Sequence, residues 1–200
     1  TTDPGAPRMS VVIVTPDTFA TIRRTVECLA RQTARDALEL VVVAPSLARL
    51  DADGALLAAF ARVVRVEGGV SGSIGPANAE GVRRATAPIV ALAEDHAFPD
   101  PDWAETLIAA HEGPWAAVGP SIRNANPGSA VSRADLLIGY GPWLNPADAR
   151  EMPFLPGHNT SYKREVLLGF GERLGTMLDA ETLLHWELRS LGLRLWLEPS

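Results

Sequence analysis

The hydrophobic positions of this chain follow two different periods in turn. Continuous apolar runs, typical of strands buried on both faces, occur at residues 10–15, 38–43, 62–66, 88–93 and 115–118. Between these runs, apolar residues recur at helical spacing, so we expect helices over 19–30, 56–60, 77–85 and 101–111. This alternation predicts right-handed βαβ units and an α/β domain with a mainly parallel central sheet flanked by helices.

The regular alternation ends near residue 120. Polar segments at 123–129 and 141–146 predict loops, and a helix is expected between them over 131–140. Long polar connections inside a compact domain are often functional. A helix over 179–191 and a last strand over 193–197 complete the predicted elements.

The length of 200 residues suits one domain. We expect residues 9–200 to form this domain, and residues 1–8, which hold two prolines and a glycine, to be a disordered N-terminal extension. Hydrophobic residues make up 46% of the chain and charged residues 21%, a composition that indicates a globular protein. The formal net charge of -6 argues against a nucleic-acid partner, which would favour a basic surface.

Cysteine content and hydropathy bear on the cellular location. Cys28 is the single cysteine, which excludes an internal disulfide and favours a reducing compartment. The apolar runs are too short to cross a bilayer as a helix. The sequence therefore predicts a cytoplasmic protein without a membrane span, and it leaves open peripheral contact with the inner face of a membrane.

An acidic residue and a histidine follow the strand expected over 88–93. Glu94 and His96 are separated by one residue and precede a predicted turn at 99–102. Because ligands of open α/β sheets bind at the carboxyl ends of the strands, we expect both residues at the binding edge. If the chain stays extended there, their side chains share one side and Asp95 points to the other. An oxygen and a nitrogen donor on one side suit a divalent cation such as Mn²⁺, and the alternative is a solvated turn.

Several motifs share a recognisable order along the chain. They are VVIVT (11–15), NAEGVRRA (78–85), LAEDH (92–96) with PDPDW (99–103), GHNTSYKR (157–164), and ETLL (181–184) leading to GLR (192–194). In order and spacing they resemble a family 2 glycosyltransferase with the GT-A fold, over about residues 9–199. The resemblance implies a Rossmann-like single domain that moves a sugar from a nucleotide-diphosphate donor to a hydroxyl acceptor, with inversion at the anomeric carbon. The acceptor could be a saccharide, a lipid-linked molecule or a small molecule.

The resemblance also implies roles for individual acidic residues. In the family, a motif after the fourth strand holds a metal that grips the donor diphosphate, which places Mn²⁺ or Mg²⁺ at Glu94 and His96. Asp95 is then a ribose or metal contact if the chain turns there. The family's general base lies at the start of the late helix, which corresponds to Glu181. Asp179 is the alternative base, or stands in for the acidic neighbour that the family has at the preceding position.

The donor site shows one departure from the family pattern. Strand two of the family ends in acidic residues that read the nucleotide base, whereas this chain has Ala44 there. We therefore expect base recognition through backbone groups around Thr15 and Ser46, with Asp17 as the nearby carboxylate that could compensate. The remaining residues expected at the donor are Asn78 and His158. His158 is also a candidate third metal ligand, and the alternative is a loop histidine without a function.

Four further side chains are candidates for a structural role, and three of them also have a functional alternative. His185 lies one helical turn beyond Glu181, so it either orients Glu181 or is a buried helix histidine. His111, near a predicted helix end, is expected to complement the helix dipole. Tyr140 and Trp143 either stack on a sugar ring or pack beneath a loop.

Two other functions stay open at this point. A metal-dependent hydrolase could be built from Glu94, His96, His158 and Glu181, although the chain lacks a compact motif such as His-Glu-x-x-His. A glycosyltransferase domain that binds nucleotide or protein without turnover is the non-catalytic alternative, supported by Ala44.

Overall fold

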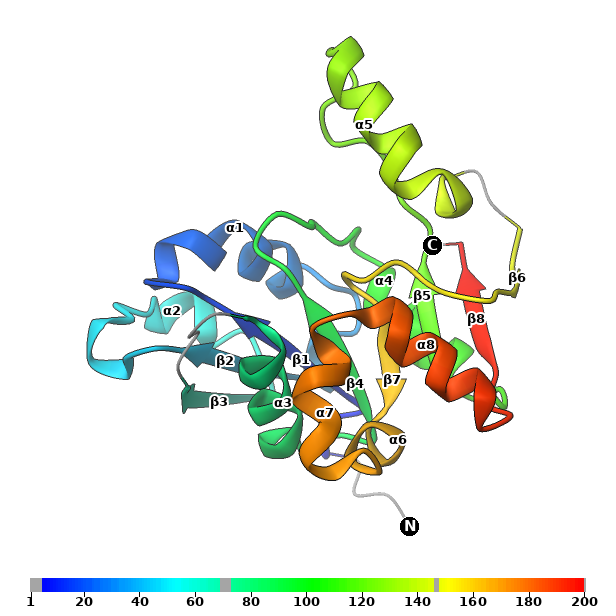
Figure 1. Ribbon diagram of the computed structural model, residues 1–200. Helices are drawn as coiled ribbons and strands as arrows, with labels where there is room; N and C mark the ends of the chain where they lie inside the picture. The colour runs from blue at the N-terminus through cyan, green and yellow to red at the C-terminus, as the bar shows by residue number, and fades with distance from the viewer. Residues whose placement is uncertain (1–4, 69–72, 146–147, 200) are drawn as a thin grey trace.

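The computed structural model describes residues 5–68, 73–145 and 148–199. Within these residues, helices flank both faces of an eight-stranded sheet in the order β3-β2-β1-β4-β7-β5-β8-β6 (Figure 1). Strands β1 to β5 and β8 share one direction, and β7 and β6 run antiparallel to their neighbours. The expected α/β fold with a mainly parallel sheet is therefore confirmed.

The strands are β1 (Met9–Val14), β2 (Leu38–Ala44), β3 (Arg62–Glu67), β4 (Ile89–Ala93), β5 (Ala117–Pro120), β6 (Arg150–Glu151), β7 (Ser161–Lys163) and β8 (Leu195–Glu198). The α-helices are α1 (Phe19–Ala30), α2 (Gly54–Leu57), α3 (Gly75–Arg84), α4 (Trp103–Ala110), α5 (Ala130–Tyr140), α6 (Arg164–Leu168), α7 (Leu174–Leu178) and α8 (Glu181–Ser190). Short 3₁₀ turns are η1 (Arg35–Ala37), η2 (Leu47–Arg49), η3 (Gly141–Trp143) and η4 (Gly171–Arg173). No helix in this described part of the chain is long and apolar enough to cross a membrane.

Alternation along the strands divides the core between the two faces of the sheet. Along β1, Met9, Val11 and Ile13 join the cluster beneath α1 and α4, whereas Val12 and Val14 join the cluster beneath α3 and α6 to α8. All six residues of β1 are buried, as expected for a central parallel strand. The sheet is thus covered on both faces, and its carboxyl edge is left as the place for a site.

Some predicted element boundaries are wrong. Strand β5 begins at residue 117, not at 115. Trp115 lies just before the strand and stacks on Trp196, with ring centroids 4.3 Å apart. The late helix begins at Glu181, not at 179, because Ala180 has a non-helical backbone (φ -146°, ψ 83°). Strand β7 has no apolar run, so periodicity gave no sign of it.

Two predicted irregular segments are described only in part. Residues 1–4 of the expected N-terminal extension and residue 146 of the loop expected over 141–146 lie outside the described residues. The Arg8 N–H donates to the Ala37 carbonyl at 2.8 Å. The expected disorder of the N-terminal extension stays a prediction.

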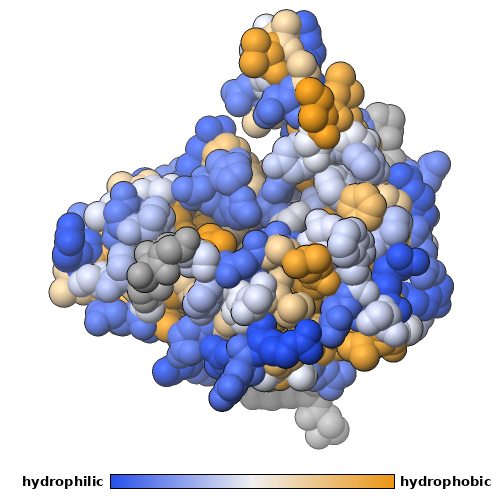
Figure 2. Space-filling view, viewed as in Figure 1, coloured by the Kyte–Doolittle hydropathy of each residue, from blue (hydrophilic) through white to orange (hydrophobic). Residues whose placement is uncertain are grey.

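Helix α5 projects from the body of the molecule (Figure 1). None of its residues is buried, and Val131, Leu137 and Ile138 are strongly exposed. Figure 2 shows apolar side chains on this projecting arm. The Ser129 hydroxyl caps the helix by accepting from the Ser132 N–H. Helix α5 is therefore held by the segments at its two ends and not by packing one of its faces against the body.

A buried carboxylate joins the amino-terminal ends of four strands. Glu39 on β2 is fully buried and accepts hydrogen bonds from the Ser10 hydroxyl on β1 and from the Thr86 N–H (2.7 Å) and hydroxyl (2.8 Å) ahead of β4. Arg62, the first residue of β3, completes an ion pair with Glu39 at 3.1 Å. The Ala87 N–H in turn donates to Ser10 Oγ at 3.1 Å. One side chain therefore aligns β1 to β4.

We predict that Glu39→Ala lowers the free energy of unfolding by roughly 3–5 kcal/mol, because it leaves the Thr86 amide and Arg62 without their acceptor. Urea unfolding at neutral pH measures this loss. Glu27→Ala is the matched control, since Glu27 pairs only with Arg31 at an exposed i,i+4 position and should change stability by less than about 1 kcal/mol. Equal losses in the two variants would contradict this role of Glu39.

Candidate active site

Glu94 and His96, the pair predicted after β4, lie in contact with each other. Glu94 Oε2 lies 3.1 Å from His96 Nε2. The chain turns at these residues instead of staying extended, so the condition under which Asp95 would point away is not met: Asp95 Oδ1 lies 2.9 Å from His96 Nδ1. The turn is held from α1, where the buried Thr25 hydroxyl contacts the carbonyls of Glu94 (3.0 Å) and Asp95 (3.1 Å).

The electrostatics of this turn favour a bound cation. Burial raises the pKa of the half-buried Glu94, His96 acts in the opposite direction, and the charges of Glu181 and Asp95 raise the pKa further. Raising the pKa of a carboxyl means that its charged form is disfavoured until a positive group is near. Glu94 is thus a carboxylate whose ionised form a cation would stabilise.

The donor set fits a divalent cation. Two neighbouring ligands of an octahedral ion with bonds of about 2.1 Å lie about 3 Å apart, which matches the separation of Glu94 Oε2 and His96 Nε2. Asp95 on the other ring nitrogen is the carboxylate–histidine arrangement that orients metal-binding imidazoles. Among the described residues, no group of three or more His, Cys, Asp or Glu side chains is placed to hold a metal. Water and a bound diphosphate would therefore supply the remaining ligands.

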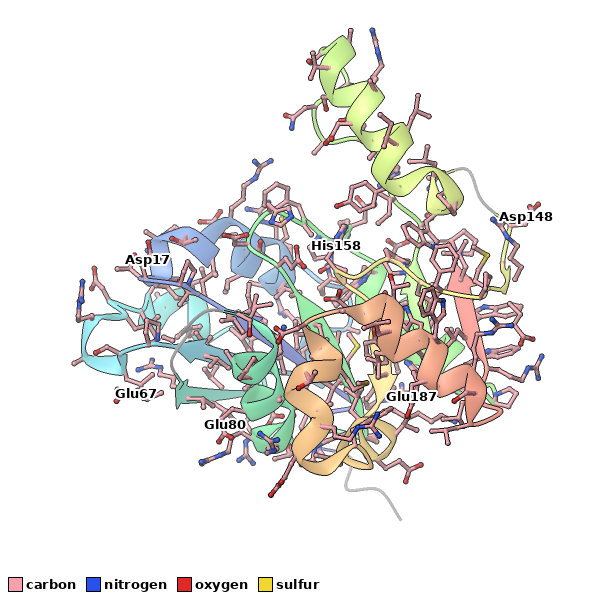
Figure 3. All side chains as sticks on the ribbon, in the orientation of Figure 1. Asp17, Glu67, Glu80, Asp148, His158 and Glu187 are labelled. Carbon is pink, nitrogen blue, oxygen red and sulfur yellow. The ribbon has the colours of Figure 1, made fainter. Side chains whose placement is uncertain are left out.

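His158 faces the same turn from the segment before β7. Its ring centroid lies 6.1 Å from that of His96 and 5.1 Å from that of Tyr140. Figure 3 shows His158 between the sheet and the base of α5. Burial, followed by the charge of His96, lowers the pKa of His158 to about 4, so its imidazole is neutral at neutral pH. The structure brings His158 to the predicted site as a neutral donor or acceptor.

Glu181 reaches the same region from the start of α8. A Cβ built on Gly157 would lie 3.2 Å from the carboxyl carbon of Glu181, so this carboxylate rests against the backbone of the residue before His158. Its charge contributes to raising the pKa of Glu94 and, after burial, that of Tyr162. The amino end of α8 stabilises a carboxylate at this position through the helix dipole.

Asp179 is held elsewhere. Its Oδ1 accepts from the Gly75 N–H at 2.7 Å and its Oδ2 accepts from the Ser73 hydroxyl at 3.0 Å, at the amino end of α3. Gly75 is needed for this approach, because a Cβ there would lie 2.2 Å from the Gly175 carbonyl oxygen. Both oxygens of Asp179 are therefore committed to the contact between α3 and α7.

The residues expected at the donor lie at the ends of β1 and β2. Thr15 is fully buried, and its hydroxyl donates to the Thr18 carbonyl at 2.7 Å. Asp17 accepts from the Thr21 hydroxyl and the Thr18 N–H, and these hydrogen bonds, Thr21 first, lower its pKa. Asp17 Oδ1 is thus occupied by the start of α1, which leaves Oδ2 for any contact with a nucleotide.

The other expected donor residues differ in accessibility. Ala44 is fully buried and its carbonyl accepts from the Gly68 N–H at 2.9 Å, whereas Ser46 is half-buried. Asn78 is 6% exposed, and its Oδ1 lacks a partner within the described residues. Buried amide oxygens are normally hydrogen-bonded, so Asn78 is the donor candidate with an unused acceptor.

The sequence analysis missed an acidic residue beside Ala44. Glu67 ends β3, pairs in register with Ala44, and accepts from the Leu47 N–H at 3.0 Å (Figure 3). The signal was available, since the parallel register of β2 and β3 brings the end of one strand beside the end of the other. A carboxylate therefore lies next to the place where the family has one, on the neighbouring strand.

The two remaining histidines have structural surroundings. His185 is fully buried: its Nδ1 accepts from the Leu155 N–H at 3.3 Å, so its Nε2 donates to the Tyr162 hydroxyl at 2.9 Å. Of the two interpretations of His185, the structure therefore supports the buried helix histidine and not the residue that orients Glu181. The expectation for His111 is wrong, because burial lowers its pKa to about 4 and a neutral imidazole does not complement a helix dipole. Its Nε2 lies 2.9 Å from the Ser161 hydroxyl.

The two aromatic candidates, Tyr140 and Trp143, have different surroundings. Trp143 is buried and donates its indole N–H to the Phe154 carbonyl at 3.1 Å, so it packs beneath the loop. Tyr140 is partly exposed beside His158, and burial followed by the charge of Glu94 raises its pKa. Tyr140 therefore belongs to the wall of the site.

The matches to known proteins agree with this geometry. Residues 10–169 match the family model described as glycosyl transferase family 2. This chain belongs to that family. No curated protein sequence gives a significant match.

Solved structures share the fold at low sequence identity. A mannosyltransferase from Pyrobaculum calidifontis, in complex with GDP-Man and Mn²⁺, is 22% identical with a TM-score of 0.67, over 97% of this chain and 55% of that one. TarS 1-349 from S. aureus is 16% identical with a TM-score of 0.60, over 95% and 57% of the two chains. Glucosyl-3-phosphoglycerate synthase from Mycobacterium tuberculosis is 19% identical with a TM-score of 0.59, over 96% and 70%. The family 2 domain thus has the expected GT-A fold, and the chain spans little more than half the length of the first two structures.

The buried histidine on α8 predicts a pH dependence of stability. Burial lowers the pKa of His185 to about 4 in the folded state, against 6.5 for an unperturbed group, so unfolding takes up a proton between these values. The stabilisation is complete above about pH 6.5 and is lost as the pH falls towards 4, which amounts to about 3 kcal/mol for this residue. In His185→Gln, the fall in unfolding free energy between pH 7 and 4, measured with urea, should be smaller by about this amount. An unchanged slope would show that His185 titrates normally in the folded protein.

Proposed function

We propose that this domain transfers a sugar from a nucleotide-diphosphate donor to a hydroxyl acceptor, with inversion at the anomeric carbon. The observation that carries the proposal is the convergence of Glu94, His96 and Glu181 at the carboxyl edge of the sheet in a family 2 chain. Two solved structures with this fold contain Mn²⁺ together with GDP-Man or with UDP and glucosyl-3-phosphoglycerate. These ligands are bound by those two proteins, and they support the proposal of a similar use of the sheet edge here.

Glu94 and His96 are the residues that would hold a divalent cation, Mn²⁺ or Mg²⁺. When bound, such a cation neutralises the negative charge that develops on the departing nucleoside diphosphate. Asp95 fixes the ring of His96 through Nδ1. His158, neutral and adjacent, is placed to contact a phosphate oxygen as a hydrogen-bond donor.

Glu181 is the proposed general base. As the acceptor oxygen bonds to the anomeric carbon, its proton passes to the carboxylate of Glu181. The bond from that carbon to the diphosphate oxygen breaks, and its electron pair leaves with the nucleoside diphosphate. Attack from the face opposite the leaving group, in one displacement, inverts the configuration. Asp179 is not available for this role, because Ser73 and Gly75 occupy both of its oxygens.

The nucleotide is proposed to lie over the ends of β1 and β2. Thr15, Ala44 and Ser46 would offer backbone groups to the base, with Asp17 and Glu67 as the flanking carboxylates. Asn78 would accept a hydrogen bond at its unpartnered Oδ1. Because a single cysteine suits a reducing compartment, the cytoplasm is the proposed location.

The metal assignment is tested by removing both ligands. Glu94→Ala with His96→Ala should abolish the effect of Mn²⁺ on GDP or UDP binding in calorimetric titration, while the thermal transition is retained. The control is Glu187→Ala, which removes a surface carboxylate on α8 paired with Arg173. If the double variant keeps its Mn²⁺ dependence, the cation lies elsewhere, with His158 and Asp95 the next candidates. A wild-type protein that binds no nucleotide would favour the non-catalytic alternative.

The base assignment is tested by a pair of amide substitutions. Glu181→Gln keeps the size of the side chain but accepts no proton, so kcat should fall by about 10²–10⁴-fold while donor affinity is little changed. Asp179→Asn should keep most of the turnover but lower the thermal stability, because it weakens the contact with α3. Release of nucleoside diphosphate at saturating substrate concentrations measures the turnover of both variants. Loss of turnover in a folded Asp179→Asn alone would refute the assignment to Glu181.

A further inference from the structure

Thr25 is a polar residue on the buried face of α1, and it is fully buried. The other buried residues of this helix are apolar: Phe19, Ile22, Val26 and Leu29. A buried hydroxyl needs a hydrogen-bond partner, and a threonine inside a helix commonly finds one in a carbonyl of the preceding turn. Here the hydroxyl reaches the carbonyls of Glu94 (3.0 Å) and Asp95 (3.1 Å), 69 and 70 positions later in the chain. The one polar position on this buried face is therefore used by the turn after β4.

We propose that Thr25 is a positioning residue of the cation site, whose hydroxyl holds the turn in the form in which Glu94 and His96 bind a divalent cation together. The inference rests on the proposed function for the cation at these two side chains. Because Thr25 is fully buried, it acts through the backbone of the turn and not by contact with a ligand. It adds a residue of α1 to a site that otherwise consists of the segment after β4.

The two carbonyls control the conformation of the turn. The Glu94 carbonyl belongs to the peptide plane before Asp95, and the Asp95 carbonyl belongs to the plane after it. Since the chain between two rigid planes can rotate only about φ and ψ, holding both planes restricts both angles of Asp95. The Glu94 carbonyl also accepts from the Ala97 N–H at 3.4 Å, which closes a turn with Asp95 and His96 at its centre. The directions in which the side chains of Glu94 and His96 leave the chain depend on these planes.

Without a cation, the charges at the turn work against this conformation. The carboxylates of Asp95 and Glu181 both repel the carboxylate of Glu94. Repulsion between like charges favours a more open turn until a positive charge is bound. The Thr25 hydroxyl opposes this opening from the core side of the turn. The turn is therefore ordered before the cation arrives, and its ordering does not have to be offset by the energy of binding.

The remainder of the segment after β4 is attached near the end of α1 by a different side chain. Gln32 is 2% exposed, and its Nε2 donates to the Asp100 carbonyl at 2.6 Å while its Oε1 accepts from the Ala104 N–H at 2.9 Å. These contacts hold the start of α4 and not the turn at 94–97. Loss of the Thr25 hydroxyl should therefore loosen the turn without detaching the segment.

The test measures how much Mn²⁺ strengthens nucleotide binding, by calorimetric titration with GDP and with UDP in the presence and absence of Mn²⁺. Thr25→Val removes the hydroxyl and keeps the branched shape of the side chain. The gain in affinity that Mn²⁺ gives should shrink by roughly tenfold, the usual effect of losing a hydrogen bond to a buried polar group. Nucleotide affinity without Mn²⁺ should equal that of the wild type, whereas a general loss of structure would lower both affinities.

Two further variants separate positioning from packing. Thr25→Ser keeps the hydroxyl but loses a buried methyl group, so it should lower the thermal stability and still retain the full effect of Mn²⁺. Thr33→Val is the matched control, because the Thr33 hydroxyl also links the region of α1 to the segment after β4, by donating to Glu105 on α4 at 2.7 Å. This bond lies beyond the turn, so Thr33→Val should leave the effect of Mn²⁺ unchanged.

Three results would overturn the role of Thr25 and leave the proposed function standing: a full effect of Mn²⁺ in Thr25→Val, an equal loss in Thr25→Ser, or an equal loss in Thr33→Val. Two other results would refute the cation site itself, and with it the role of Thr25. One is a wild-type protein whose nucleotide binding does not respond to Mn²⁺. The other is a response that survives in Glu94→Ala with His96→Ala.

Discussion

The hydrogen-bonded carboxylate of Glu39 is the constraint on which the position of the site depends. It is fully buried, and it accepts from β1 and from the turn before β4 while it pairs with the first residue of β3. A slip of one residue in any of these strands would turn the core-facing side chains to the opposite face and separate the groups that satisfy this charge. The carboxyl ends of β1, β2, β3 and β4 therefore reach the opposite edge in a defined register. Thr15, Ala44, Glu67 and Glu94 owe their relative positions to that register.

At that edge, the side chains are arranged to hold charged groups close together and do not add to the stability of the fold. Thr25 on α1 holds the turn through two carbonyls, and Asp95 holds the ring of His96. Glu94, partly withdrawn from water, faces the charge of Glu181, which raises its pKa. Two carboxyl groups placed in this way are unfavourable for the folded protein alone, and they become favourable when a cation and a proton donor enter. The same region holds Asn159 in a left-handed conformation. Strain and unsatisfied polar groups thus coincide with the proposed chemistry.

Sequence patterns sufficed for the parts of this fold that depend on burial. The parallel strands and most helices follow from apolar periodicity, and Glu94 with His96 follows from the position after a buried strand. Their meeting was predicted for a wrong reason, since the chain turns at Asp95 and does not stay extended.

The remaining features depend on tertiary contacts that no local pattern encodes. Strand β7 is short and polar, and its inward groups are satisfied by His111, Val118 and His185 from other elements. Asp179 accepts from the Gly75 N–H at the start of α3, and the two residues are 104 positions apart in the chain. Helix signals in the sequence could not predict this contact. The lack of a hydrogen-bond partner for Asn159 Oδ1 among the described residues becomes visible only when the neighbouring donors are placed.

The topology places the turn at Glu94 between two parts of the carboxyl edge of the sheet. From β1 the chain passes through α1 to β2 and β3 on one side, and then returns through α3 to β4 on the other side of β1. The helices on these two paths cover opposite faces of the sheet, so the carboxyl ends of β1 and β4 flank the crevice where open α/β sheets bind ligands. The ends of β1, β2 and β3 lie on one side of Glu94, and a cavity lined by His96, His158 and Tyr140 lies on the other, toward β5 and α5. In the proposed reaction, a nucleotide on the first side and an acceptor on the second would meet at the turn between them.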